Sequence, residues 1–163
     1  MKVPVSWLRE FVAIPESATG RDVAELLLRV GFEVESVDTV GDVRGTLVVG
    51  RVQSVEELTD FKKPIRWCQV DVGSANGAVD TPGVRGIVCG ARNFAEGDLV
   101  VVALPGTTLP GDFTIATRET YGHVSDGMMC SARELGLSDD HSGLIVLPAG
   151  SATPGDDAFS ILG

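Results

Sequence analysis

The chain has 163 residues, 44% hydrophobic and 22% charged, which is enough to bury a full core and excludes a disordered chain. No apolar run reaches the ~20 residues of a membrane span, and residues 1–15 lack a signal-peptide core, so we expect a cytoplasmic protein with no membrane contact. The net charge of −10 argues against a strong, broadly basic nucleic-acid binder, so any RNA contact has to come from a local patch.

Residues 1–40 are expected to form a small helix–helix–strand module. A short helix is predicted over Ser6–Val12, and a second helix begins at the capping box Thr19–Asp22 and keeps the helical spacing of apolar residues. Apolar and polar residues then alternate over 32–40, which predicts a half-buried strand.

From residue 41 onward the pattern changes to short strands separated by glycine and proline. The predicted strands are Leu47–Val55, Ile65–Val72, Gly86–Cys89, Leu99–Leu104, Phe113–Thr117 and Leu144–Leu147. Several short strands of this kind are typical of a small closed β-barrel, of which the oligonucleotide-binding (OB) fold is one. We therefore predict an α+β chain: a small N-terminal α/β module (1–40), an OB-fold barrel (41–150) and a tail (151–163).

The potential metal ligands are scattered rather than clustered. Cys68, Cys89 and Cys130 are odd in number and lack CxxC spacing, which argues against a disulfide framework and against a zinc site. The adjacent side chains of Asp139–His141 point to different faces of an extended chain and do not converge easily on one ion. We expect reduced, mostly buried thiols and no metal site.

The stretch 125–148 raises the question of nucleophilic catalysis. Cys130 or Ser131, with His141 and an aspartate, would supply a nucleophile, a base and an orienting group. No GxSxG elbow is present, however, and Ser131 with Glu134 forms a capping box that accounts for both residues. An independent cysteine hydrolase is therefore a weaker hypothesis, and we expect no catalytic residue here.

Basic and aromatic side chains gather around the second predicted barrel strand. Lys62, Lys63 and Arg66 lie in the preceding loop and in the first residues of the strand, interleaved with Phe61 and Trp67. Three further arginines could extend this surface: Arg51, Arg92 and Arg118. Barrels bind nucleic-acid strands with basic groups on the phosphates and aromatic faces under the bases. An RNA-binding face is one hypothesis, and a solvated loop beside core aromatics is the other.

Several motifs occur in a characteristic order and spacing. They are Met1–Val12, Gly31–Glu35, Ile87–Asn93, Val102–Gly106, Leu109–Gly111, Ser125–Ser131, Glu134–Leu137, Asp140–Gly143 and Leu147–Pro148. Together they resemble the N-terminal region of the β subunit of bacterial phenylalanyl-tRNA synthetases over essentially the whole chain. Thr59–Arg66 departs from the wider family pattern and looks like an actinobacterial variant.

The resemblance implies a fragment of a longer subunit, with a tRNA-binding OB domain and a small N-terminal module packed beside it. The implied partners are tRNA(Phe) and the α subunit in an α2β2 heterotetramer. ATP and magnesium belong to the intact ligase. The resemblance places its aminoacylation site in the α subunit and its editing site further along the β subunit, so this fragment is expected to hold no cofactor and neither of these two sites. The alternative is a structural or assembly module of the same synthetase with little direct RNA contact.

Overall fold

The computed structural model describes residues 3, 5–35, 37, 43–76, 84–140 and 142–162. Its helices are α1 (Val5–Arg9), α2 (Gly20–Arg29), the 3-10 turn η1 (Gly73–Ala75) and α3 (Ala158–Leu162). Its strands are β1 (Leu47–Leu58), β2 (Ile65–Asp71), β3 (Arg85–Cys89), β4 (Leu99–Ala103), β5 (Thr108–Leu109), β6 (Phe113–Thr114), β7 (Arg118–Thr120), β8 (His123–Ser125), β9 (Met128–Met129) and β10 (Val146–Leu147). Within this described part, no helix has both the length and the apolar character to span a bilayer.

The second N-terminal helix starts where its capping box predicts. The Asp22 amide donates to the Thr19 hydroxyl at 3.3 Å, and the Thr19 amide donates back to the Asp22 carboxylate at 2.7 Å. Gly31, at φ +91°, follows the end of α2. The first helix is shorter than predicted, because α1 ends at Arg9 and the chain turns before Val12.

The strand predicted over residues 32–40 is wrong for the part that the structure describes. Residues 32–35 and 37 carry no strand, and the remaining residues of that range lie outside the described chain. Phe32 is 63% exposed, so its side chain does not form the buried face that the alternation predicted. Alternation alone specifies a strand only when a neighbouring strand supplies the ladder.

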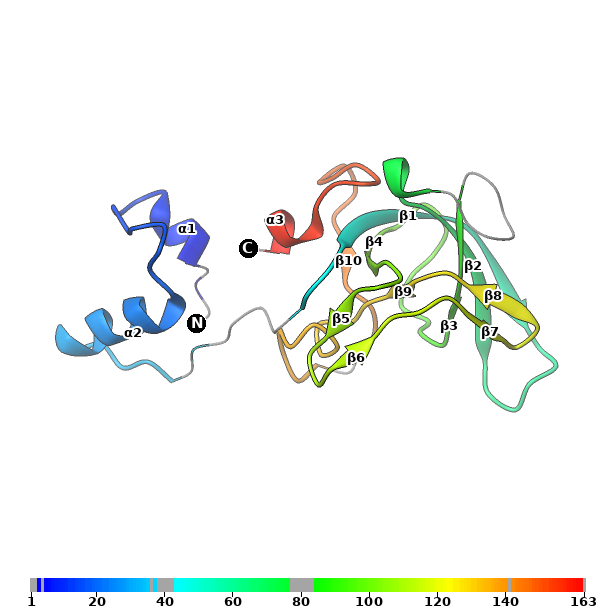
Figure 1. The fold of residues 1–163 in the computed structure, drawn as a ribbon, viewed down its shortest axis with the longest axis horizontal. Helices are drawn as coiled ribbons and strands as arrows, with labels where there is room; N and C mark the ends of the chain where they lie inside the picture. Colours follow the sequence, from blue (N-terminus) through cyan, green and yellow to red (C-terminus); the bar gives the residue numbers. More distant parts are fainter. Residues whose placement is uncertain are drawn as a thin grey trace.

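The remaining strands wrap into a nearly closed barrel (Figure 1). Strand β1 pairs antiparallel with β2 and with β4, and β2 pairs with β3. β9 and β10 pair with successive parts of β4, and β8 and β9 also pack on β3. The Asp126 amide, between β8 and β9, donates to the Gly86 carbonyl of β3 at 2.8 Å. The resulting order β1-β2-β3-(β8/β9)-β4-β1 is that of an OB barrel, so the predicted α+β fold class is confirmed.

Both faces of the central strands are buried. Val48 and Val52 of β1 point into the barrel, and Leu47 and Val49 point to its outer side, yet none exceeds 6% exposure. The inner cluster is built from β1–β4 and β9, whereas loops and the C-terminal segment cover the outer cluster. This double burial explains the apolar runs at the start of β1 (Leu47–Val49) and throughout β4.

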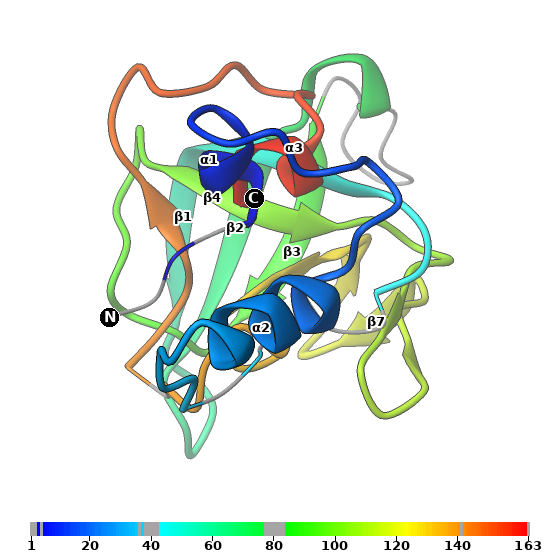
Figure 2. The same cartoon turned by 90° about the vertical axis from the view of Figure 1, so that its left-hand side faces the viewer.

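The segment predicted as a tail is part of the barrel body. The Gly155 amide donates to the Val49 carbonyl at 2.8 Å, and the Val49 amide donates to the Asp156 carbonyl at 2.9 Å. Ala158 at the start of α3 is fully buried. Figure 2, seen from the helical end, shows α1 and α2 in front of this barrel.

Candidate nucleic-acid interface

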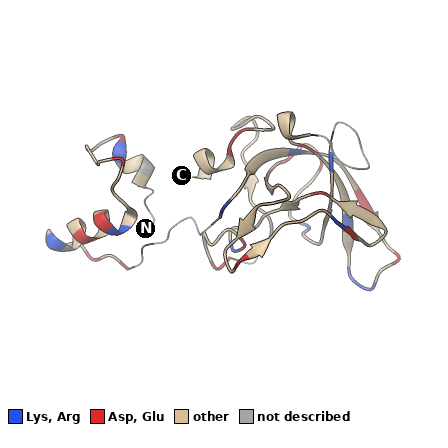
Figure 3. Ribbon diagram, in the orientation of Figure 1, with Lys and Arg blue, Asp and Glu red and all other residues tan. Residues whose placement is uncertain are grey.

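The predicted basic loop is the tip of the β1–β2 hairpin, residues 59–64. The hairpin register pairs Leu58 with Ile65, so Lys62 and Lys63 lie at its exposed end. Basic residues are seen in blue at the tip of this hairpin in Figure 3. Neither lysine forms an ion pair or a hydrogen bond with any residue that the structure describes. The two ammonium groups therefore face solvent and are available to an anion.

The β7–β8 hairpin contacts the tip of the β1–β2 hairpin. Strands β7 and β8 are joined by Tyr121 and Gly122, which have φ angles of +52° and +77°, the signature of a tight type I′ turn. The Tyr121 ring packs edge-on against Phe61 with ring centroids 4.7 Å apart and planes at 77°. Two segments about sixty positions apart in the chain thus share one aromatic contact.

Trp67 lies beneath the β7–β8 hairpin rather than on an open surface. Its indole stacks on the His123 ring at 4.5 Å between centroids, and only 9% of the residue is exposed. A Cβ at Gly86 would overlap the indole, so glycine on β3 makes the room that the ring occupies. The side chain packs the hairpin onto the sheet, and its role in RNA binding stays a prediction.

Glu57 holds two of the predicted RNA-binding arginines. Its Oε1 accepts from Arg66 Nε at 2.8 Å and from an Arg92 guanidinium nitrogen at 3.1 Å. Arg66 also donates to the Phe94 carbonyl at 3.1 Å and lies over the Phe94 ring. Burial alone would raise the pKa of Glu57, but the hydrogen bond and charge of Arg66, with the charge of Arg92, hold it below its usual value.

The other two predicted arginines lie apart from this cluster. Arg51 is exposed on β1, where it pairs in register with Asp71 and Leu99. The Arg118 guanidinium on β7 lies 5.9 Å from the centre of the Phe113 ring. The predicted residues therefore do not form one continuous basic stripe. The pattern did not identify Phe61 and Tyr121 as a pair, although the Tyr121–Gly122 sequence was a usable signal for a two-residue turn.

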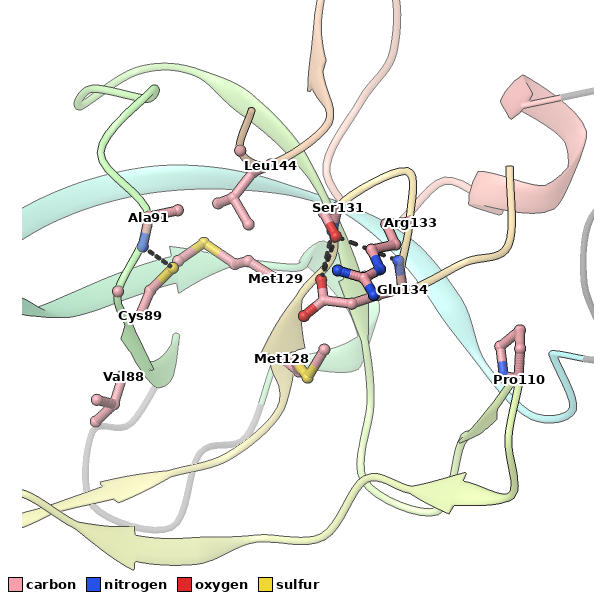
Figure 4. A pocket seen from close by; sticks show the side chains of 12 residues that line it. Val88, Cys89, Ala91, Pro110, Met128, Met129, Ser131, Arg133, Glu134 and Leu144 are labelled. Carbon is pink, nitrogen blue, oxygen red and sulfur yellow. Dashed lines mark hydrogen bonds between the residues drawn. The ribbon is translucent and has the colours of Figure 1, made fainter. Parts of the chain in front are cut away.

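A cavity of about 570 Å³ lies between the ends of β3 and β9 and includes part of the stretch considered for catalysis (Figure 4). The Ser131 hydroxyl and amide both donate to the Glu134 carboxylate at 2.7 Å, which confirms the predicted capping box. Cys130 is fully buried, and this burial, followed by the Glu134 charge, raises the pKa of its thiol to about 12. A thiol so protonated is not an activated nucleophile.

Metal ligands are not grouped in the described chain. Among residues 43–76, 84–140 and the other described segments, no three His, Cys, Asp or Glu side chains could share an ion. Asp140 instead accepts from the amide and the hydroxyl of Ser142 at 2.8 and 2.9 Å, whereas His141 lies outside the described residues.

An OB barrel with basic and aromatic residues at a loop end is typical of nucleic-acid-binding modules. A family model described as "Putative tRNA binding domain" matches residues 47–157, and the chain belongs to this family. The solved chaperones CsaA of Picrophilus torridus and Bacillus anthracis are 13% and 14% identical, with TM-scores of 0.46 and 0.45. Each covers 68% of this chain, which in turn covers 88% and 87% of theirs.

Similar curated sequences are phenylalanine–tRNA ligase β subunits. Those of Thermobifida fusca and Mycolicibacterium paratuberculosis are 62% and 60% identical over 100% of this chain, and that of Streptomyces avermitilis is 55% identical over 99%. These matches confirm the resemblance noted in the sequence. The chain spans 19% of the length of each of these relatives.

Proposed function

We propose that this chain is the tRNA-binding OB module of a phenylalanine–tRNA ligase β subunit and that it contacts tRNA(Phe) through the β1–β2 hairpin tip. Membership of the tRNA-binding family supports RNA as the ligand, and the similar β subunits support the ligase. The observation that supports the contact site is the pair Lys62 and Lys63, which are exposed and have no anionic partner among the described residues of a chain of net charge −10.

Ion pairs on the barrel surface favour these lysines over the arginines beside them as phosphate contacts. Arg66 is only 14% exposed and is neutralised by Glu57, and Arg92 shares the same carboxylate. A phosphate approaching Arg66 or Arg92 would have to compete with an existing ion pair, whereas one approaching Lys62 or Lys63 would not. We assign Lys62 and Lys63 the leading role and Arg51, Arg66, Trp67, Arg92 and Arg118 a secondary one.

The similar β subunits support a wider proposal for the intact ligase. In it, residues 1–40 form a separate small module before the barrel, and the longer β subunit joins an α subunit in an α2β2 assembly in the cytoplasm. ATP and magnesium serve aminoacylation in that assembly. The residues of this chain contribute binding and orientation of the tRNA.

The test is a tRNA(Phe) titration at several salt concentrations with two charge-matched variants. K62E/K63E reverses two charges at the hairpin tip, and R21E/R29E makes the same change in net charge on α2, away from the barrel. We expect the tip variant to weaken binding about tenfold or more and to flatten the dependence of log Kd on log salt by about one to two. The α2 variant should change both quantities much less.

Equal effects of the two variants would contradict the hairpin tip as the contact and indicate a general charge effect. If neither variant changes affinity, the hairpin tip is not the contact. If the natural chain shows no detectable tRNA binding, the structural-module alternative stands. The melting temperature of each variant, measured alongside, separates loss of binding from loss of fold.

A further inference from the structure

The aromatic contact between the two hairpin tips is exposed in an unusual way. Phe61 and Tyr121 remain 40% and 38% exposed although their rings are in contact. In the edge-to-face arrangement the edge of one ring lies on one face of the other, so this contact leaves the other ring faces uncovered. The pair is therefore a partly open aromatic surface rather than a piece of core.

Tyr121 also occupies a backbone conformation that its side chain does not favour. At φ +52° it is in the left-handed region at the first central position of a type I′ turn, where Asn, Asp or Gly is preferred. Residues held in such regions concentrate at binding sites. A tyrosine at this position places an aromatic ring against Phe61, although an Asn, Asp or Gly would adopt the turn conformation with less strain.

Lys62 and Lys63 follow Phe61 directly in the β1–β2 loop, and Tyr121 contacts Phe61 from the β7–β8 turn. The two lysines, which have no ion pair among the described residues, therefore lie next to the open rings. Cations that reach phosphates beside an aromatic face are the combination that holds single-stranded nucleic acid. A paired base hides both of its faces in the helical stack, and a ring can stack only on a base that is free.

We propose that Phe61 and Tyr121 form a stacking platform for an unpaired base of the bound tRNA, with Lys62 and Lys63 on the flanking phosphates. This inference rests on the proposed function and specifies its substrate element: a loop or end of the tRNA rather than its helical stems. The platform supplies preference for unpaired RNA, and the lysines supply affinity that does not depend on base pairing.

The test compares a single-stranded RNA with a duplex of the same length, using the variants Phe61→Leu and Tyr121→Asn. Leucine keeps an apolar contact without a ring, and asparagine suits the left-handed position, so the hairpin of the second variant should fold at least as well as the natural one. We expect each variant to weaken single-strand binding about tenfold and to change duplex binding less than twofold, with an unchanged salt slope.

A 2-aminopurine placed in the single strand gives a direct readout of stacking. Its fluorescence should be quenched on binding to the natural chain and should recover in the Tyr121→Asn complex at saturating protein. Unchanged quenching and affinity in both variants, or an equal loss for single strand and duplex, would overturn the platform. K62E/K63E separates the two proposals. If this variant binds RNA as well as the natural chain, the proposed contact is refuted. If only the aromatic variants bind as well as the natural chain, the platform alone is refuted.

Discussion

The indole of Trp67 stacks on the imidazole of His123, with the ring centroids 4.5 Å apart and the planes 26° from parallel. This contact fastens the β7–β8 hairpin to the outer face of β2, and it fits only because Gly86 on β3 has no side chain beneath the indole. The exposed Phe61–Tyr121 pair lies between the tips of the same elements. Packing under the hairpin thus holds the proposed RNA-binding surface in place.

Replacing Gly86 with alanine should destabilise the barrel by about 1–3 kcal/mol, because the new methyl group would force the indole out of its stacked position. Urea unfolding followed by tryptophan fluorescence in a Trp7→Phe background measures this, since Trp67 is then the single tryptophan. Gly90→Ala is the matched control, because the nearest atom to its Cβ is Ile65 Cδ1 at 3.9 Å. Equal stability of the two variants would contradict the steric role of Gly86.

Asp126 closes the barrel through a buried ion pair. Its carboxylate accepts from Arg85 at 2.8 Å and from the Thr117 hydroxyl at 2.7 Å, and its side chain is only 6% exposed. Asp126→Ala should cost about 3–5 kcal/mol, because it leaves the Arg85 guanidinium buried without its anion.

The exposed pair Arg44–Asp112 provides the comparison for that variant. Its side chains are 70% and 89% exposed, so Asp112→Asn should cost no more than about 1 kcal/mol. Chemical denaturation of both variants measures the difference. If Asp126→Ala lowers the free energy of unfolding as little as Asp112→Asn does, the buried ion pair does not stabilise the closed barrel.

Glu57→Gln should tighten tRNA binding and steepen its salt dependence. The substitution releases Arg66 and Arg92 from their shared carboxylate and removes one negative charge near the hairpin tip. Glu56→Gln is the control for charge alone, since Glu56 is exposed and has no ion pair among the described residues. If both variants tighten binding equally, release of the arginines has no effect.

The same substitution carries a pH signature. Because the folded-state pKa of Glu57 is lowered, its ion pairs stabilise the fold above the ordinary carboxyl pKa of 4.5, and this contribution disappears as pH falls through the folded-state value. We therefore expect Glu57→Gln to be less stable than the natural chain at pH 7 and to approach it at pH 3. Thermal melts at the two pH values measure this. A difference in melting temperature between the variant and the natural chain that is the same at pH 7 and pH 3 would contradict it.

Alkaline pH should destabilise the barrel through its buried thiols. Burial raises the pKa of Cys68 and of Cys130 from 9.0 to about 12, so the folded state keeps protons that the unfolded state releases. The free energy of unfolding should then fall above pH 9 by up to about 1.4 kcal/mol per pH unit for each thiol. Urea unfolding between pH 8 and 10.5 measures this. The free energy of unfolding should fall less steeply with pH for Cys130→Ala than for the natural chain, whatever their absolute stabilities. Parallel slopes would refute the assignment.

Short-range patterns in the sequence were good predictors. The capping boxes at Thr19–Asp22 and Ser131–Glu134 involve residues three positions apart, so the sequence contains everything that they need. Strands β1, β2 and β4 were also predicted, because the apolar run of β4 and the apolar start of β1 are buried on both faces and make these segments stand out. The glycine-rich turns between them indicated the barrel.

Long-range contacts account for what the pattern missed. The β7–β8 strands have three residues each and intermediate to high exposure, so no apolar periodicity marks them. The basic residues looked equivalent in sequence, and only the fold brings Glu57 onto Arg66 and Arg92. Lys62 and Lys63 gain no such partner from the part of the chain that the structure describes. The choice among them therefore required three-dimensional information.

The bridge between Val48 and Asp157 has a consequence for how such a barrel is carried within a longer protein. The chain enters the barrel at the start of β1 and leaves it at Asp157, which is bridged to Val48 of the same strand. The entry and exit points are therefore neighbours. A unit connected in this way can be inserted between two parts of a larger chain, or removed from it, without pulling its attachment points apart. In the longer β subunits that this chain resembles, excision of the segment that matches residues 44–160, with a short glycine-rich joint, would test what the rest of the subunit does without the barrel.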